Sequence, residues 1–493
     1  MKKILIALLL LVIAAVAAAP YLIGSQIEKI TNQLVDKTNQ QLASAVKSNP
    51  QIQGGSLKID EYKKGYLDSQ ATGVFTLDIA DIGETKQFKI PFNTKTTHGP
   101  YLGDAGFGLA KIVSRPDLSE LDLPDAITAD TFLLESIIDF SQAMTQTLTV
   151  APIKHADENG KTVDFAGATI NSKSHVKNRL TFTADVDVKQ LVLGNKDEPP
   201  AFTLKPFQMD ISGKGDEAAL AGTYQLDSSV IEAVGGESVN ISLQKMAMVG
   251  SYKQATGADV MLGDAELSLS DLVVTNPEDL PTPIKVPNLK FSSKLEQASN
   301  NDLSIAAKYE GTLDQSLMTL MNSPVNVKTA VLDIQFKAIP IESVSEYQAM
   351  MENLMTQADN PDAGEKMQGK VLELIQSLAN NAMSTQLKVN AQADEGELVA
   401  DIDTGFKPGV NFDAAQMMQL MMAPDPSTIL PLMVGRGNVS LSKGVTDKAG
   451  LTPMIQIMAA DFVTLKDDKF VAELQIDEGQ LLINGNPLPL APQ

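Results

Sequence analysis

Strict alternation of apolar and polar residues recurs along most of this chain and limits the folds that it can adopt. In "RLTFTADVDV", residues 179–188, every second residue is apolar from Leu180 to Val188. Neighbouring side chains of a β-strand point to opposite faces, so each strand would have one face on a core and one in water. Parallel strands are buried on both faces, and the pattern therefore favours antiparallel sheet. It returns in "PFQMDIS", "NISLQKMAM", "AELSLSDLVV", "NLKFSSKL" and "AVLDIQFKA".

Helical spacing of apolar residues is found in fewer segments. It predicts an amphipathic helix over residues 24–50, a helix within "ADTFLLESIIDFSQAMTQTL", residues 129–148, and several helices after residue 341. We therefore expect an α+β fold, in which an N-terminal membrane helix is followed by an elongated, mainly antiparallel β-sheet body. Helices would pack mostly in the C-terminal third. The expected divisions are 1–23, 24–50, a β-rich body over 51–340, and a mixed helix and strand region over 341–493.

The chain begins with Lys2 and Lys3, followed by an uncharged apolar run from Ile4 to Ile23. About twenty apolar residues suffice for a helix that crosses a bilayer. Ala17 and Ala19 also resemble a signal-peptide cleavage site, so a cleaved signal is the alternative. Pro20 directly after that site disfavours cleavage, and we expect an anchor. The positive flank predicts a cytoplasmic N-terminus and a body on the outer side.

Two segments of the β-rich body resemble each other. Residues 186–212 align without a gap to residues 267–293, and the shared positions include Leu191 with Leu272 and Pro206 with Pro287. Each reads as strand, acidic loop with prolines, and strand. Either this is a true repeat of a β-unit or two hairpins have converged on one common pattern.

Composition narrows the classes of partner. The formal net charge is −22, which disfavours a nucleic-acid backbone because such binding needs clustered Lys and Arg. There is no Cys, so the chain has no disulfide and no thiol chemistry.

Three segments in order carry a resemblance to a known family. The first is aromatic, basic, Gly, aromatic, Ser and Ala, and the second is "HGPYLGDAGFGLAKI", which opens with His98, Gly99 and Pro100. The third is the ending "EGQLLINGNPLPL", with Asn484 and Gly485 in its turn. The residues of the first segment are Tyr62, Lys63, Lys64, Gly65, Tyr66, Ser69 and Ala71.

These segments, behind an apolar N-terminal run, resemble the YdgA-like family of bacterial envelope proteins. This chain departs from the family pattern at Leu67 and Asp68, where another aromatic residue and a Ser are often found. The resemblance implies a single-pass protein of a bacterial inner membrane with a periplasmic body. It implies no agreed activity and therefore transfers no catalytic residue.

A search for catalytic and metal-binding motifs finds none. The chain has no G-x-S-x-G elbow, no H-E-x-x-H and no phosphate-binding G-x-x-x-x-G-K-[ST] loop. The three histidines, His98, His155 and His175, have no helical spacing that would favour zinc. His98 beside Gly99 and Pro100 suggests a turn, and Gly65 suggests a turn or bulge. We expect no cofactor and no metal.

Methionine is concentrated late in the chain, above all in "MMQLMM". Met417, Met418, Met421 and Met422 occupy more than one face of an expected helix, so some of them would lie outside a core. Flexible Met side chains suit surfaces that meet lipid or varied partners. The four form a candidate hydrophobic groove, and core filling is the ordinary alternative.

These features predict a protein that is not an enzyme. The first expectation is an envelope scaffold that docks other envelope proteins on its sheet edges. The alternative is binding or transfer of lipid or another hydrophobic ligand along a sheet groove with a Met-rich lip. A hydrolase that uses scattered carboxylates is the third and weakest hypothesis, since no nucleophile and base pair is evident. The expected partners are the membrane, through the N-terminal helix, and envelope proteins or lipid, but no nucleic acid.

Overall fold

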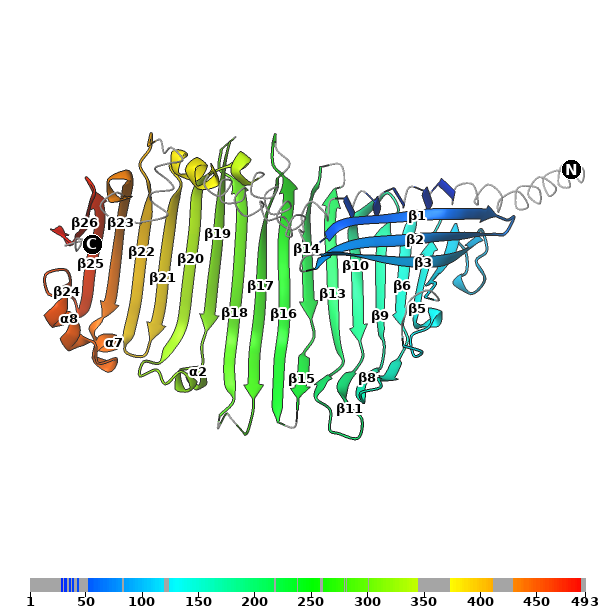
Figure 1. The fold of residues 1–493 in the computed structure, drawn as a ribbon, viewed down its shortest axis with the longest axis horizontal. Coiled ribbons are helices and arrows are strands. Elements are labelled where there is room, and N and C mark those ends of the chain that lie inside the picture. Colours follow the sequence, from blue (N-terminus) through cyan, green and yellow to red (C-terminus); the bar gives the residue numbers. More distant parts are fainter. Residues whose placement is uncertain are drawn as a thin grey trace, which may run out of the picture. The chain divides into compact units, whose positions relative to one another are not determined.

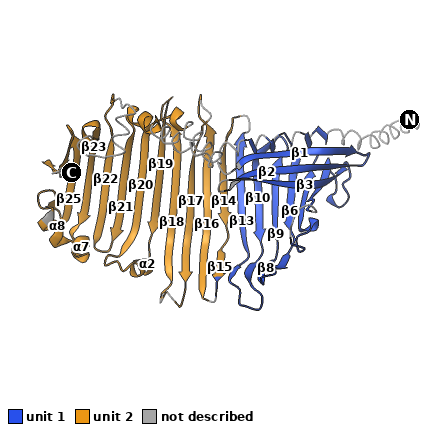
Figure 2. Cartoon of the chain, in the orientation of Figure 1, with its two compact units in different colours: residues 1–218, 235–237, 352–359 blue, residues 219–234, 238–351, 360–493 orange. Residues whose placement is uncertain are grey.

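The structure is a computed structural model, and it falls into two compact units (Figure 2). It describes ten positions between 28 and 43 and residues 52–488, except 82–83, 119–123, 217–218, 237, 258–259, 279, 281, 300, 345–372 and 411–428. Unit 1 comprises Met1–Ala218, Gly235–Glu237 and Glu352–Asp359. Unit 2 comprises Ala219–Val234, Ser238–Met351 and Asn360–Gln493.

Unit 1 is built of antiparallel strands (Figure 1). Hydrogen bonding joins them in the order β1, β2, β3, β4, β5, β6, β9, β10, β13, while β7, β8, β11 and β12 form a second series. Their bounds are β1 Ile52–Lys64, β2 Asp68–Asp81, β3 Glu84–His98, β4 Ala110–Pro116, β5 Phe132–Ile138, β6 Ala143–Val150, β7 Ile153–Ala156, β8 Lys161–Phe165, β9 Ala168–His175, β10 Asn178–Val188, β11 Leu191–Asn195, β12 Phe202–Leu204 and β13 Phe207–Asp216. Two 3-10 turns, η1 Gly103–Ala105 and η2 Ala129–Thr131, lie between strands.

The two series of unit 1 are one set of strands that break at matching positions. The breaks fall at 151–152, 166–167, 189–190 and 205–206, and the unchanged pairing register places these dipeptides opposite one another. Prolines at 152 and 206 have no N–H for the ladder, and Gly167 has φ +102°. We call this row of four dipeptides the crease.

A small core lies at one end of the unit 1 strands. It consists of Leu109, Ala110, Ile138, Met144 and Val176, each at most 7% exposed. Leu109 directly precedes β4, and the others come from β4, β5, β6 and the turn between β9 and β10, so neighbouring elements are packed together there.

Unit 2 is an antiparallel meander of long strands. Its hydrogen-bonded order is β14, β16, β17, β18, β19, β20, β21, β22, β23, β25, β26, β27, with β24 also paired to β25. The bounds are β14 Ala221–Ser228, β16 Val239–Gln254, β17 Met261–Thr275, β18 Ile284–Gln297, β19 Asp302–Thr312, β20 Val327–Pro340, β21 Ser384–Ala393, β22 Gly396–Phe406, β23 Met433–Ser442, β24 Thr464–Lys466, β25 Lys469–Asp477, β26 Gln480–Ile483 and β27 Asn486–Pro487. A further strand, β15 (Ile231–Gly235), ends at the boundary between the units.

The helices of unit 2 are short and lie at strand ends. They are α2 Gln315–Leu320, η3 Leu430–Leu432, α7 Lys443–Lys448 and α8 Thr452–Met458, and residues 341–344 and 373–380 are also helical. The last two segments are joined by a hydrogen bond of 2.8 Å between the hydroxyls of Ser343 and Ser377. Asn381 also donates to Asp302 and to the carbonyl of Ala338. These bonds fix the helical segments against the ends of β19 and β20.

Two expectations about helices are wrong. Residues 129–148 are not a helix but η2 and the strand pair β5 and β6, in which Leu134 lies opposite Leu148. The α+β class overstates the helical share, because strands dominate the described residues and α2, α7 and α8 have only six or seven residues each.

The expected N-terminal membrane helix is also corrected. None of the helices in the described part of the chain has the length and apolar character needed to cross a membrane, which contradicts both the helix and the expected single-pass location in a bacterial inner membrane. Residues 4–23, on which that prediction was made, lie outside the described residues.

Candidate functional site

One face of the unit 2 sheet carries uncharged side chains in continuous rows across the strands. Pairing registers place ten residues directly opposite one another, from Leu226 on β14 to Ala472 on β25. The members in order are Leu226, Met248, Leu267, Phe291, Tyr309, Leu332, Val389, Ala400, Val439 and Ala472. The rows on either side repeat the pattern, because the strands stay in register and the residue two along points to the same face.

We define the apolar face by the positions of β16–β23 and β25 that share this side. They are alternate residues over 246–252, 263–269, 289–295, 303–311, 330–336, 385–393, 398–406, 433–441 and 470–476, and none is Asp, Glu, Lys or Arg. Large apolar side chains on it are open to solvent. Leu289 is 39% exposed, Tyr309 46% and Phe336 37%.

The rows cover a large outline. The ten strands of the row from Leu226 to Ala472 have nine intervals of about 4.8 Å, or roughly 43 Å, and four such rows about 6.8 Å apart outline an area on the order of 850 Å². A monomeric soluble protein rarely exposes a contiguous apolar patch above about 300–600 Å². Most side chains within this outline are half-buried, and Leu289, Tyr309 and Phe336 are among those open to water. The face is therefore a candidate surface for another apolar molecule.

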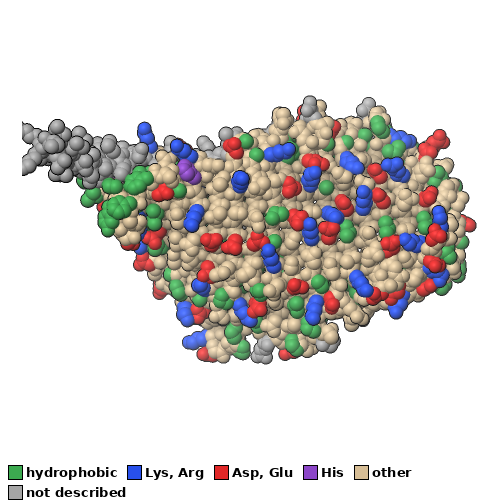
Figure 3. All heavy atoms as spheres, turned by 180° about the vertical axis from the view of Figure 1, so that it is seen from behind, with side chains coloured by type: hydrophobic (Ala, Val, Ile, Leu, Met, Phe, Trp, Pro, Cys, Tyr) green, Lys and Arg blue, Asp and Glu red, His purple; other side chains and the backbone are tan. Residues whose placement is uncertain are grey.

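The opposite face of the same strands is polar. Lys290 pairs with Glu266 at 2.9 Å and Lys308 with Glu310 at 2.6 Å, and positive and negative side chains alternate over it (Figure 3). The side chains of these ion pairs remain accessible to water, and ion pairs of this kind contribute little to the free energy of unfolding. The sheet is thus amphipathic, and water is the natural neighbour of the polar face alone.

One end of the apolar face is covered by the chain itself. Leu303, Ile339 and Ile341 form a buried cluster against which Leu378 and Met383 pack, beside the helical residues 373–380 (Figure 1). A smaller cluster around Ala379 continues this cover toward β22. The apolar face is therefore closed along one set of strand ends and open over its central rows.

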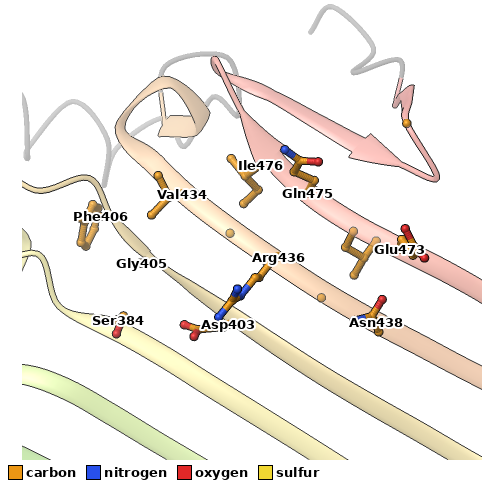
Figure 4. A pocket seen from close by; sticks show the side chains of 14 residues that line it. Ser384, Asp403, Gly405, Phe406, Val434, Arg436, Asn438, Glu473, Gln475 and Ile476 are labelled. Carbon is orange, nitrogen blue, oxygen red and sulfur yellow. The ribbon is translucent and has the colours of Figure 1, made fainter.

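A cavity of about 650 Å³ lies over β21, β22, β23 and β25 (Figure 4). Arg436 lies opposite Asp403 on one side and Gln475 on the other, and its side chain is directed toward Asp403. Glu473 adds a second carboxylate to the lining. A single guanidinium beside two carboxylates disfavours an anion, and no nucleophile and base lie together there. This cavity offers recognition at most and no evident chemistry.

The three residues Tyr62, Ser69 and His98 form a buried hydrogen-bond network in unit 1. The Tyr62 hydroxyl donates to the Ser69 hydroxyl at 3.0 Å, and His98 Nε2 lies 3.1 Å from the same oxygen. Ser69 is 1% exposed and His98 2%, and Nδ1 of His98 is buried without a hydrogen-bond partner. A serine and histidine at this distance resemble a nucleophile and its base. Both side chains are closed to a substrate in this structure, which favours a structural role for the network.

Electrostatics agree with a neutral His98. Burial lowers the pKa of His98, and Lys64 acts in the same direction, while the backbone of Tyr66 and the Asp68 carboxylate oppose the shift. Burial is the dominant cause because charging an imidazole away from water is costly.

The other family-marker residues also have local structural roles in the structure. Gly65 lies in the turn between β1 and β2, where an added Cβ would lie 2.8 Å from the Asp68 carbonyl oxygen. Gly99 has even less room, with the Gly108 carbonyl oxygen 1.8 Å from its built Cβ, and Pro100 follows it. Gly65 does not need positive φ, so close approach rather than a special backbone angle explains it.

Asn484 and Gly485 form the turn between β26 and β27, with φ values of +49° and +79°. The Asn484 side chain donates to the carbonyl of Phe462 and accepts from the backbone N–H of Glu473. It therefore ties three segments of the C-terminal region together. Tyr66 is exposed and has no catalytic neighbour in the described part of the chain.

The predicted Met groove cannot be placed. Met417, Met418, Met421 and Met422 lie within 411–428, outside the described residues. Within the described ranges, no group of three or more His, Cys, Asp or Glu is arranged to hold a metal ion. The apolar face was missed as a site because its residues are far apart in sequence. Its signal was the alternation itself, read on every strand at once.

Fold and surface together define a class: an antiparallel β-sheet protein with one uncharged face and, among the residues that the structure describes, no recognisable catalytic centre. Residues 1–491 match the family described as "Bacterial protein of unknown function (DUF945)", and the chain belongs to this family. No curated protein and no solved structure matches it. Membership therefore agrees with the expected bacterial family without a known activity.

Proposed function

We propose that this protein binds the acyl chains of lipids or fatty acids along the apolar face of unit 2. The observation that carries the proposal is the ten-residue row from Leu226 to Ala472, flanked by further uncharged rows. Burial of apolar surface is worth about 25 cal/mol per Å², so a ligand that covers even part of this face gains several kcal/mol.

The dimensions suit an acyl chain. A row of roughly 43 Å exceeds the roughly 30 Å hydrocarbon thickness of a bilayer, which two acyl chains span end to end. An extended acyl chain therefore fits along a row, perpendicular to the strands. The covered end near Leu303 would shield one side of such a ligand from water.

A protein partner, as in the scaffold hypothesis, is less well supported. Protein interfaces form about one hydrogen bond per 100–200 Å², so a face on the order of 850 Å² would be expected to offer several. On the strands that define the apolar face, these four rows have five hydroxyl side chains and no charged group; the five are Tyr252, Ser293, Tyr309, Thr385 and Thr404. A hydrocarbon needs no hydrogen bond.

The proposal is tested by titrating the full chain with cis-parinaric acid, a fluorescent fatty acid. The test variant replaces three exposed residues of the apolar face, Leu289→Gln, Tyr309→Gln and Phe336→Gln. Losing on the order of 80 Å² of apolar contact costs about 2 kcal/mol, so Kd should rise more than about tenfold.

The matched control is Val249→Gln. Val249 is 42% exposed and lies opposite Glu266, on the polar face of the same sheet. The control should bind the fatty acid as the natural chain does, and circular dichroism should show both variants folded. An unchanged Kd in the triple variant, or an equal loss in the control, would contradict the proposal.

We also propose that the chain falls within the YdgA-like branch of its family. The support is the first marker segment, whose residues Tyr62 and Ser69 meet the His98 of the second segment in one network. The markers are thus joined in space, which gives their common occurrence a structural reason.

A further inference from the structure

Three neighbouring turns of unit 1 carry large apolar side chains into water. Tyr66 and Leu67 lie between β1 and β2, Tyr101 and Phe107 between β3 and β4, and Phe140 between β5 and β6. Their exposed fractions are 52%, 59%, 63%, 73% and 56%. Alternate turns of an antiparallel meander lie at the same end of its strands. The five side chains therefore lie together at one set of strand ends in unit 1. We call them the hairpin-tip cluster.

Backbone hydrogen bonds hold these turns to each other. The His98 N–H donates to the Leu67 carbonyl at 2.8 Å, and the Leu109 N–H donates to the Ile138 carbonyl at 2.8 Å. Beneath the turns, Leu102 is 2% exposed and Ile138 is fully buried. The exposed side chains therefore stand on a packed base and are not the frayed end of a loop.

The aromatic rings of Tyr101 and Phe107 form the centre of the cluster. Their centroids are 5.6 Å apart, and the two residues are joined by an antiparallel bridge. Hydrophobic side chains gather visibly at this end of unit 1 (Figure 3). Exposed aromatic side chains on a well-packed base are typical of a surface that binds another molecule.

Two acidic residues near the cluster, Asp104 and Asp139, have local partners. Asp104 forms an ion pair with Lys111 at 2.8 Å, and the Asp139 carboxylate accepts hydrogen bonds from the N–H groups of Ser141 and Ala143. The chain as a whole carries −22. Lys111 also pairs with Glu135 at 3.3 Å, so it offsets part of the negative charge at these turns and weakens the repulsion from an anionic headgroup surface. Asp139 keeps its charge, because the hydrogen bonds lower the pKa of its carboxyl.

We propose that the hairpin-tip cluster docks reversibly on the surface of a lipid bilayer. Tyr and Phe side chains favour the boundary between headgroups and hydrocarbon, where one end is apolar and the other wet. Side chains on three turns along one edge can enter a planar interface together. The ion pair of Asp104 with Lys111 lessens the negative charge at these turns, and a surface of zwitterionic lipid has no net charge of its own to oppose the approach.

The chain has no Trp, which allows a single reporter to be placed in the cluster. Full-length protein with Phe107→Trp is mixed with phosphatidylcholine vesicles whose acyl chains are brominated near the headgroup or left unmodified. Its emission should shift to the blue and be quenched by at least half on the brominated vesicles. The matched control is Phe88→Trp, in β3, where Phe88 is 48% exposed and lies opposite Leu77. It should show neither change.

A second variant tests the cluster as a whole. Tyr101→Ser, Phe107→Ser and Phe140→Ser together should lower the partition coefficient onto vesicles at least tenfold, whereas Phe88→Ser should not. An unshifted and unquenched Phe107→Trp reporter overturns the proposal, whether or not the protein sediments with vesicles. So does equal quenching at both positions, which would mean that contact is not confined to the tips. Phe107 is not part of the apolar face, so this proposal and the proposed function can fail separately.

Discussion

Several strands of unit 1 are interrupted at the crease, whereas the long strands of unit 2 are continuous. The difference can be read on the two similar segments of the sequence. In unit 1, residues 189–190 separate β10 from β11. The gapless alignment carries these positions to Ser270 and Asp271, which lie inside the unbroken strand β17. Asp271 has φ +50°, so unit 2 keeps a trace of the same irregularity.

Uninterrupted strands allow unit 2 to form continuous rows of apolar side chains. A strand that runs through without a break keeps its side chains in phase over 8 to 16 residues, as in β14 and β16. Ten such strands in register then align their apolar positions into continuous rows. In unit 1 the breaks divide each face into shorter pieces, and its exposed apolar residues gather instead at the hairpin tips.

The largest effect should follow from filling the crease. Gly167 has φ +102°, and a Cβ there would lie 2.7 Å from the Val150 carbonyl oxygen. Gly167→Val should lower the free energy of unfolding by roughly 2–3 kcal/mol, through backbone strain and the clash. Urea unfolding followed by circular dichroism measures this.

The matched comparison in unit 2 is Gly311→Ala. Gly311 lies within β19, and its built Cβ meets nothing nearer than 3.6 Å. Its effect should stay within about 0.5 kcal/mol. Equal losses at the two glycines would mean that the crease is not a special site.

A smaller effect should come from pH, and it should be confined to unit 1. The pKa of His98 is lowered in the folded state by burial, whereas an unfolded histidine titrates near about 6.5. Below that pH the unfolded chain binds a proton at His98, whereas the folded chain, in which the pKa of His98 is lowered, does not. The stability contributed by neutral His98 is therefore full above about pH 6.5 and is lost as pH falls. The protection factor at Ile138, which corrects for the slower intrinsic exchange at low pH, should fall between pH 6.5 and 5, while protection factors in unit 2 stay unchanged.

The control for this prediction is a second histidine of unit 1. His98→Gln should remove the pH dependence in that window, and His155→Gln in β7 should leave it in place. Carboxylates such as Asp104 and Asp139, whose pKa values are lowered, act in a more acidic range and do not confuse the result. A slope that survives His98→Gln would assign it to another group.

Much of the fold was readable from local sequence. Alternation along residues 179–188 predicted β10, and the same pattern predicted antiparallel pairing in both units. The helix predicted over 129–148 is wrong. Its apolar residues, Leu133, Leu134, Ile137 and Ile138, have helical spacing, but the segment forms β5 and β6, which pair with each other. The spacing of apolar residues within one segment carries no information about the strand with which that segment pairs.

The candidate site was less predictable. The Met-rich segment attracted attention because its residues are adjacent, whereas the apolar face joins Leu226 and Ala472, almost 250 residues apart. Only the pairing registers bring such residues into one row. His98 was expected to form a turn, and nothing in the sequence announced that its ring would meet Ser69.

Acyl chains are proposed to lie on the apolar face of unit 2. The most direct measurement places a single Trp on either face, with Tyr309→Trp on the apolar side and Val249→Trp on the polar side, and adds a brominated fatty acid. The account predicts strong, saturable quenching at position 309 and only weak collisional quenching at position 249. Equal quenching of the two reporters, or none at position 309 at saturating fatty acid, would contradict it.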